Sequence, residues 1–134
     1  MEQNYPKTSL SVGATLRAVL VNDGAVSALC GDVIPVAVAP ETRLPYIVYR
    51  RTELLPTVTK SGYPASDAVA VEVLCCAADY AQSIAMAEAV RRALETCRED
   101  PAGCVKVRSM RLETSEETFE GDAYIQSLTF RILV

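Results

Sequence analysis

Hydrophobic and polar positions change their period along this chain, and two segments follow the period of a helix. Residues 8–22 place apolar side chains at the i, i+4, i+7 and i+8 positions of one helix face. Residues 79–97 (DYAQSIAMAEAVRRALETC) show the same spacing more strongly, and the turn residues 100–103 end that run. A short helical turn is predicted at 25–30, after Asp23-Gly24 breaks the first helix. The pattern therefore predicts two main helices.

Five further segments predict β-strands, mostly through alternation of apolar and polar side chains. Pro35 interrupts the first segment, and because proline cannot donate a ladder hydrogen bond, this strand is expected at a sheet edge. The apolar positions change phase within the fourth segment, and a bulge near Ser109 would reconcile its two halves. The predicted strands are 32–39, 46–55, 69–76, 105–113 and 124–134.

Two segments between these strands are predicted to be loops. Residues 56–67 (PTVTKSGYPASD) carry the densest turn chemistry, and residues 114–122 are acidic. The element order α-β-β-β-α-β-β has too few helices to cover both faces of a sheet. We therefore predict a single α+β domain over residues 1–134, an antiparallel or mixed sheet with two main helices packed on one face. The other face is expected to be semi-polar, with Glu72, Thr129, Arg131 and Lys106 or Arg108.

The distribution of charged residues argues against a nucleic-acid partner, and the length of the apolar runs argues against a membrane span. The net charge is −4, and the basic residues are spread along the 134 residues instead of forming the stripe that neutralises phosphates. No apolar run reaches the ~20 residues of a membrane span. The first residues lack the basic start and apolar stretch of a secretory signal. We expect a cytoplasmic protein, or one made in the cytoplasm and built into something larger.

The sequence contains no histidine, which removes the usual general base and the commonest metal ligand. Its five cysteines are odd in number and lack a C-x-x-C spacing. Cys75 and Cys76 are neighbours in a strand and should point to opposite faces. Cys97 and Cys104 flank a turn and could approach one another. The favoured interpretation is reduced, mostly buried thiols that pack as small apolar residues.

Few other groups suggest chemistry. The acidic segment offers carboxylates to a hard cation, but its spacing does not match the EF-hand pattern and Phe119 interrupts it. A solvated hairpin loop is the favoured interpretation. Lys60-Ser61-Gly62 lacks the frame of a phosphate-binding loop and lies between strands. We therefore predict no enzyme, no cofactor and no metal. The carboxylates in question are Glu116, Glu117, Glu120 and Asp122.

Several short segments, following the amphipathic first helix, carry a shared pattern. They are Ala25–Gly31 (AVSALCG), Leu44–Val48 (LPYIV), Val69–Val73 (VAVEV), Val90–Leu94 (VRRAL) and Tyr124–Ile132 (YIQSLTFRI). With them the chain resembles the small tail-completion proteins of long-tailed phages, also called tail terminators or tail-to-head joining proteins. The resemblance covers nearly the full length and rests on the order of elements. Cys75-Cys76 is not part of the pattern.

The resemblance implies a structural virion assembly protein without catalytic residues. Proteins of that family look like α+β domains that form a six-fold ring, cap the tail tube and offer a surface to the head connector. The expected partners are thus other copies of the chain, the tail tube protein and a head connector protein. The expected location is the host cytoplasm during assembly and then the virion tail. The alternatives are another small head–tail connector protein, or a small-molecule-binding or regulatory α+β module, which should show an enclosed pocket.

A closed ring needs two different contact patches on each subunit. The loop 56–67, which reaches out, and the proline-marked strand 32–39, which offers an edge, are the candidate patches. Basic side chains near the loop suit an acidic tube or connector surface, and tyrosine suits an interface. A merely solvated basic face is the alternative interpretation. The predicted protein-contact residues are Arg50, Arg51, Lys60 and Tyr63.

Overall fold

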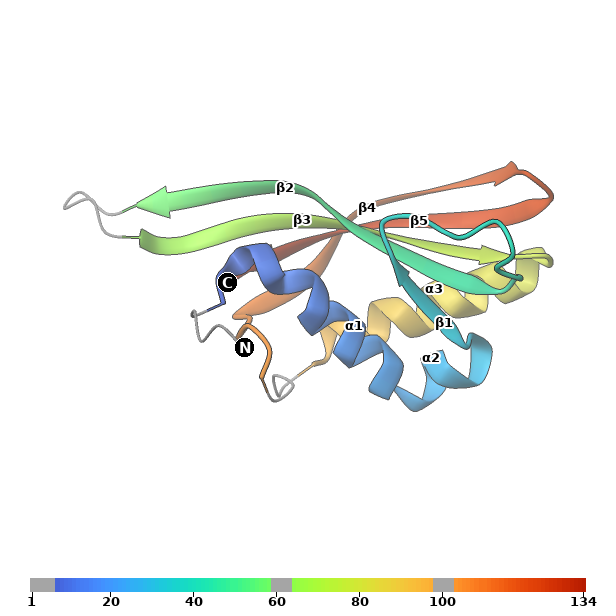
Figure 1. The fold of residues 1–134 in the computed structure, drawn as a ribbon, viewed down its shortest axis with the longest axis horizontal. Helices are drawn as coiled ribbons and strands as arrows, with labels where there is room; N and C mark the ends of the chain where they lie inside the picture. Colours follow the sequence, from blue (N-terminus) through green and yellow to red (C-terminus); the bar gives the residue numbers. More distant parts are fainter. Residues whose placement is uncertain (1–6, 59–63, 98–102) are drawn as a thin grey trace.

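The computed structural model describes residues 7–58, 64–97 and 103–134 (Figure 1). It confirms an α+β fold in which the helices and strands follow the predicted order. The elements are η1 (Ser9–Ser11), α1 (Val12–Asn22), α2 (Gly24–Leu29), β1 (Asp32–Pro35), β2 (Tyr46–Val58), β3 (Pro64–Ala77), α3 (Tyr80–Glu95), β4 (Ser109–Glu120) and β5 (Ala123–Leu133).

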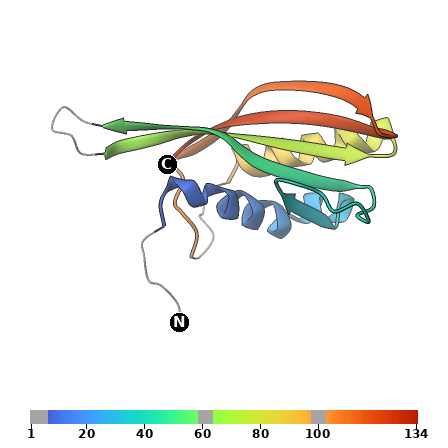
Figure 2. The ribbon, with the colours of Figure 1, turned by 45° about the horizontal axis from the view of Figure 1, so that its top comes forward.

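The strands form a mixed five-stranded sheet in the order β1-β2-β3-β5-β4. β1 is parallel to β2 and lies at a sheet edge, as Pro35 predicts, and the other pairs are antiparallel. All three α-helices lie on one face of the sheet, and its other face is left open (Figure 2). The β2–β3 ribbon extends past the helices at one end, and the β4–β5 hairpin lies at the opposite end (Figure 1).

The core fills the space between the helices and the covered face of the sheet. From α1, Val12, Leu16 and Leu20 point into it at the predicted helical spacing, and all three are fully buried. Phe130 of β5 is the largest fully buried side chain among the residues that the structure describes. The sheet and α3 add Ile47, Val69, Val71, Val73, Cys75, Leu128 and Ile132 and Met86, Val90 and Leu94.

Local chemistry fixes how α1 sits on the sheet. Asp23 ends α1 and caps α2, since its carboxylate accepts a hydrogen bond from Val26 N at 3.0 Å. Gly13 faces the ring of Tyr49 so closely that a Cβ there would lie 3.2 Å from Tyr49 Cε2. The absence of a side chain at Gly13 therefore lets α1 approach β2.

Two predicted boundaries of the first three strands differ from the structure. β1 ends at Pro35 instead of continuing to residue 39, because Val36 turns the backbone to a φ of 64°. The loop predicted at 56–67 is shorter, because β2 continues to Val58 and β3 begins at Pro64. The turn-forming residues in this segment therefore do not prevent β2 and β3 from pairing as far as Val58 and Pro64. The register of this pairing shifts at two places, between Arg51 and Glu53 and between Thr57 and Val58.

The acidic segment 114–122 was expected to be a loop, and this prediction is wrong. β4 begins at Ser109 and pairs with β5 as far as Glu120. Its connection to β5 is the turn Gly121-Asp122, where both residues have positive φ values of 57° and 63°, as tight hairpin turns require. Beyond Leu112 both faces of this strand are exposed, and the sequence there does not alternate between apolar and polar residues. The bulge lies between Leu112 and Thr114, further along than the predicted position near Ser109.

Truncation of Phe130 tests the position of the core. We expect Phe130→Ala to lower the free energy of unfolding by about 3–5 kcal/mol, because it leaves a cavity under the helices. Leu133→Ala on the same strand, at a side chain that is 39% exposed, should cost about 1 kcal/mol or less. Urea unfolding of both variants measures the difference. Equal costs would contradict a core centred on Phe130.

Candidate interaction surfaces

The predicted contact residues do not form one described patch. Arg50 lies on the open face, where its Nε is 3.1 Å from Glu72 Oε1. Arg51 points to the helix side and donates from Nη1 to the carbonyl oxygen of Leu10 at 3.1 Å. Lys60 and Tyr63 lie outside the described residues. The role of all four in protein contacts stays a prediction.

The open face carries a network of paired charges. Arg131 holds Glu113 through two hydrogen bonds, Nε to Oε2 at 2.9 Å and Nη2 to Oε1 at 3.2 Å, and its Nη1 lies 3.4 Å from Glu53 Oε1. The hydrogen bond from Arg131 lowers the pKa of Glu113 and raises that of Arg131 in return. Glu72 also accepts a hydrogen bond from Ser127 Oγ at 3.3 Å. These charges satisfy one another within the face.

A groove runs between α1 and the edge of the sheet, and we call it the α1 groove. It has a volume of about 510 Å³. Leu10 at one end of the groove is 64% exposed and Val21 at the other is 36% exposed. Arg17 is the charged side chain among the described residues that line it, and its Nε donates to Val33 O at 3.2 Å. The remaining lining residues are Ser11, Gly13, Ala14, Ala18, Asn22, Pro35 and Tyr49.

A second apolar surface lies at the β4–β5 hairpin, and we call it the aromatic patch. It consists of Phe119, Tyr124 and Tyr80, with ring centroids 4.8 Å apart for Phe119–Tyr124 and 5.7 Å for Tyr80–Tyr124. Phe119 is 57% exposed and Tyr80 is 46% exposed. Glu117 accepts hydrogen bonds from Tyr80 Oη at 2.9 Å and from Gln126 Nε2 at 3.0 Å. The hydrogen bond to Glu117 raises the pKa of Tyr80.

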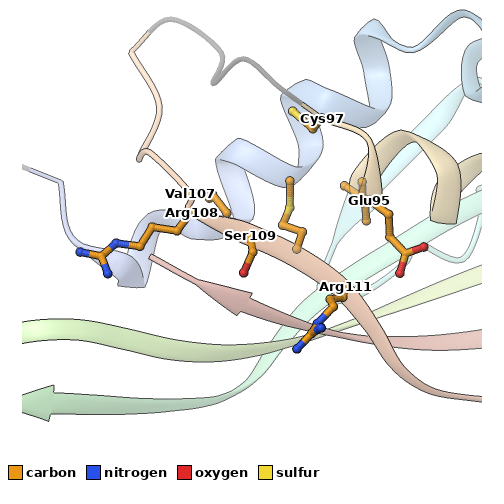
Figure 3. Close-up of a pocket in the computed structure, with 8 residues that line it drawn as sticks. Glu95, Cys97, Val107, Arg108, Ser109 and Arg111 are labelled. Carbon is orange, nitrogen blue, oxygen red and sulfur yellow. The ribbon is translucent and has the colours of Figure 1, made fainter.

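A smaller cavity of about 270 Å³ lies where α3 meets the start of β4. Figure 3 shows the side chains of Arg108 and Arg111 extending away from the thiol of Cys97. The carboxylate of Glu95 accepts hydrogen bonds from Leu112 N and Arg91 Nε, both at 2.9 Å. The backbone donor is the main cause of the lowered pKa of Glu95. The hydrogen bond from Leu112 N to Glu95 ties α3 to β4. The residues that line the cavity do not direct several polar groups toward one point, as the residues of a ligand site usually do.

Burial favours the protonated form of three thiols. Cys75 is fully buried, and this burial strongly raises its pKa. Burial raises the pKa of Cys76 to about 11. Cys30 Sγ donates to Asp32 O at 3.1 Å, and desolvation raises its pKa as well. Within the described ranges, no three Cys, Asp or Glu residues gather to hold a metal ion. The expectation of apolar thiol packing is met at these three positions.

The comparisons with known proteins decide the family. A model of the family described as tail completion protein gp17 matches residues 14–134. The chain belongs to this family. The match begins within α1 and includes every later element, so this tail completion protein is a phage-like structural protein of the tail. The sequence resemblance is thereby confirmed.

A solved structure supports the fold of this tail completion protein. A chain in the virion of the native gene transfer agent (GTA) particle superposes with a TM-score of 0.68 at 21% identity. The match covers 95% of this chain and 98% of that chain. No curated protein matches the sequence. Within the described ranges, no helix is long and apolar enough to cross a membrane.

Sequence reasoning missed both apolar surfaces of this tail completion protein. Phe119 was noted only as an interruption of an acidic run, although a large apolar residue among carboxylates is itself a sign of an exposed contact. The α1 groove was missed because Gly13, Ala14 and Ala18 look like ordinary helix residues. Their shared small size on the outer side of α1 was the available signal.

Alkylation tests the state of the thiols. At pH 8 the raised pKa of Cys76 leaves about one thiol in a thousand ionised. We therefore expect iodoacetamide to leave Cys75 and Cys76 unmodified in the folded protein and to modify both in strong denaturant. Mass spectrometry of the peptides measures this. Rapid labelling of Cys76 in the folded protein would show that its surroundings open readily.

Proposed function

We propose that this protein caps the tail tube as a homo-hexameric ring, which stops tube growth and offers a surface to the head connector. The observation that carries the proposal is the family match over residues 14–134, which includes all the strands and main helices. It makes the protein a structural component of a tail, and the tube end is the place where a completion protein acts. Assembly would take place in the host cytoplasm before the ring joins the virion tail.

The surface chemistry supports a role in contacts and not in catalysis. A sequence without histidine lacks the usual proton-transfer group. The described thiols of Cys30, Cys75 and Cys76 are made less reactive by burial. The charged residues of the open face pair with each other across the strands. These features favour a protein that works through its outer surfaces.

The β2–β3 ribbon is suited to contact two partner proteins, one on each of its faces. Arg50 lies on the open face and Arg51 on the helix side, although they are neighbours in sequence. The ribbon extends past the helices, so both of its faces are accessible there (Figure 1). We propose that Arg50, Arg51, Lys60 and Tyr63 contact the tail tube and the head connector.

Tube-length measurement tests the proposal. Purified protein added to polymerising tail-tube subunits of the same tail should shorten the tubes, and electron microscopy should show a ring at one tube end. Arg51→Glu should weaken this effect about tenfold in the concentration required, which corresponds to the loss of one interfacial charge contact. Arg92→Glu makes the same charge change on the exposed side of α3 and serves as the control.

Two results would count against tube capping. Unchanged tube lengths without binding to tube ends would contradict it. Binding to tube ends without any change in length would instead favour a head–tail connector that joins a tube already closed by another protein.

A further inference from the structure

The α1 groove has the chemistry of a receptor for an exposed aromatic side chain. Gly13, Ala14 and Ala18 leave space along α1, and the exposed Leu10 and Val21 provide apolar walls at the ends. Two guanidinium groups lie beside this apolar surface, because Arg17 lines the groove and Arg51 reaches the carbonyl oxygen of Leu10. A guanidinium has five donor hydrogens, and each of the two hydrogen bonds to a backbone carbonyl uses one of them. Both groups keep donors for an incoming carboxylate.

The aromatic patch has the complementary chemistry. Phe119 shares its face of β4 with Glu117, whereas Glu116 and Glu120 point to the opposite face. A tilted contact with the ring of Tyr124 holds the Phe119 ring in place, while more than half of the residue remains in solvent. Aromatic side chains in such positions commonly supply the largest share of an interface's binding energy. The patch is an apolar projection with one carboxylate, that of Glu117, beside it.

These two surfaces lie on opposite edges of the same sheet. The order β1-β2-β3-β5-β4 places the groove at the β1 and β2 edge and the hairpin at the β4 edge. A projection at one edge and a matching recess at the other give a head-to-tail contact between copies. Such heterologous contacts close into rings when the rotation between copies allows it.

We propose that the aromatic patch of one copy docks into the α1 groove of the next copy, with Phe119 entering the groove and Glu117 facing Arg17. A second copy of this chain is the occupant that the observations favour, since both complementary surfaces, with opposite charges, belong to one chain. The inference rests on the proposed ring and names its subunit interface.

Photocrosslinking tests the contact directly. With p-benzoylphenylalanine in place of Phe119, the purified full chain at high concentration or at tube ends should give covalent multimers on irradiation. Mass spectrometry should map the attachment to residues 8–22 of a second copy. The same amino acid in place of Glu116, which lies on the other face of β4, is the control and should not reach α1. Multimers that map elsewhere, or no multimers under either condition, would overturn the proposal.

Charge exchange provides an independent test. Arg17→Glu and Glu117→Arg should each weaken self-association about tenfold in analytical ultracentrifugation, and a mixture of the two variants should associate through the restored pair. Phe119→Ala should weaken association at least as much without loss of folding, because Phe119 is 57% exposed. Circular dichroism and thermal unfolding verify the fold of each variant. If the mixture associates no more strongly than each variant alone, these residues are not in contact.

The outcomes separate this interface from the capping role. If Phe119→Ala protein still forms rings and still shortens tubes, the interface assignment is wrong and the capping role stands. If the wild-type crosslinks map to α1 while tube lengths never change, the interface is correct and the tube-capping proposal fails.

Discussion

The structure depends on the packing of α1 and α3 against one face of the sheet. Fully buried aliphatic side chains from both helices meet Phe130 and its neighbours there, and burial of this apolar surface is the main driving force for folding. Because the helices are few, the other face of the sheet stays open to solvent. Its side chains are therefore polar, and Arg131 pairs there with two carboxylates.

This one-sided architecture also separates the contact surfaces of the protein. The helix layer ends short of the β2–β3 ribbon at one end, and the β4–β5 hairpin occupies the other (Figure 1). The apolar residues left outside the core, such as Leu10 and Phe119, lie near the limits of this layer. Surfaces placed at different edges of one sheet can be contacted independently of one another.

The sequence was sufficient to predict a helix layer on one face of a sheet. It was insufficient to predict the α1 groove and the aromatic patch. The spacing of Val12, Leu16 and Leu20 predicts a helix with one buried face, and the alternating apolar positions of β3 and β5 predict strands with one buried face. All of these predictions agree with the observed burial. The first part of β4 lies within the predicted strand 105–113, but its second half was expected to be a loop, because both sides face solvent there and carboxylates replace the alternation that marks a half-buried strand. The α1 groove arises from the approach of Gly13 to Tyr49, which are distant in sequence and brought together only by folding.

The turn Gly121-Asp122 gives the hairpin a further property. Both residues have left-handed backbone angles. A two-residue turn of this kind matches the twist of the two flanking strands and joins them directly. The strands on either side stay paired from Ala123 and Glu120 inward. An arm built in this way is already ordered before it meets a partner, so little conformational entropy remains to be lost on binding. Rigidity of this kind favours binding in one orientation, and a small number of contacts can then define the angle between the arm and whatever it binds.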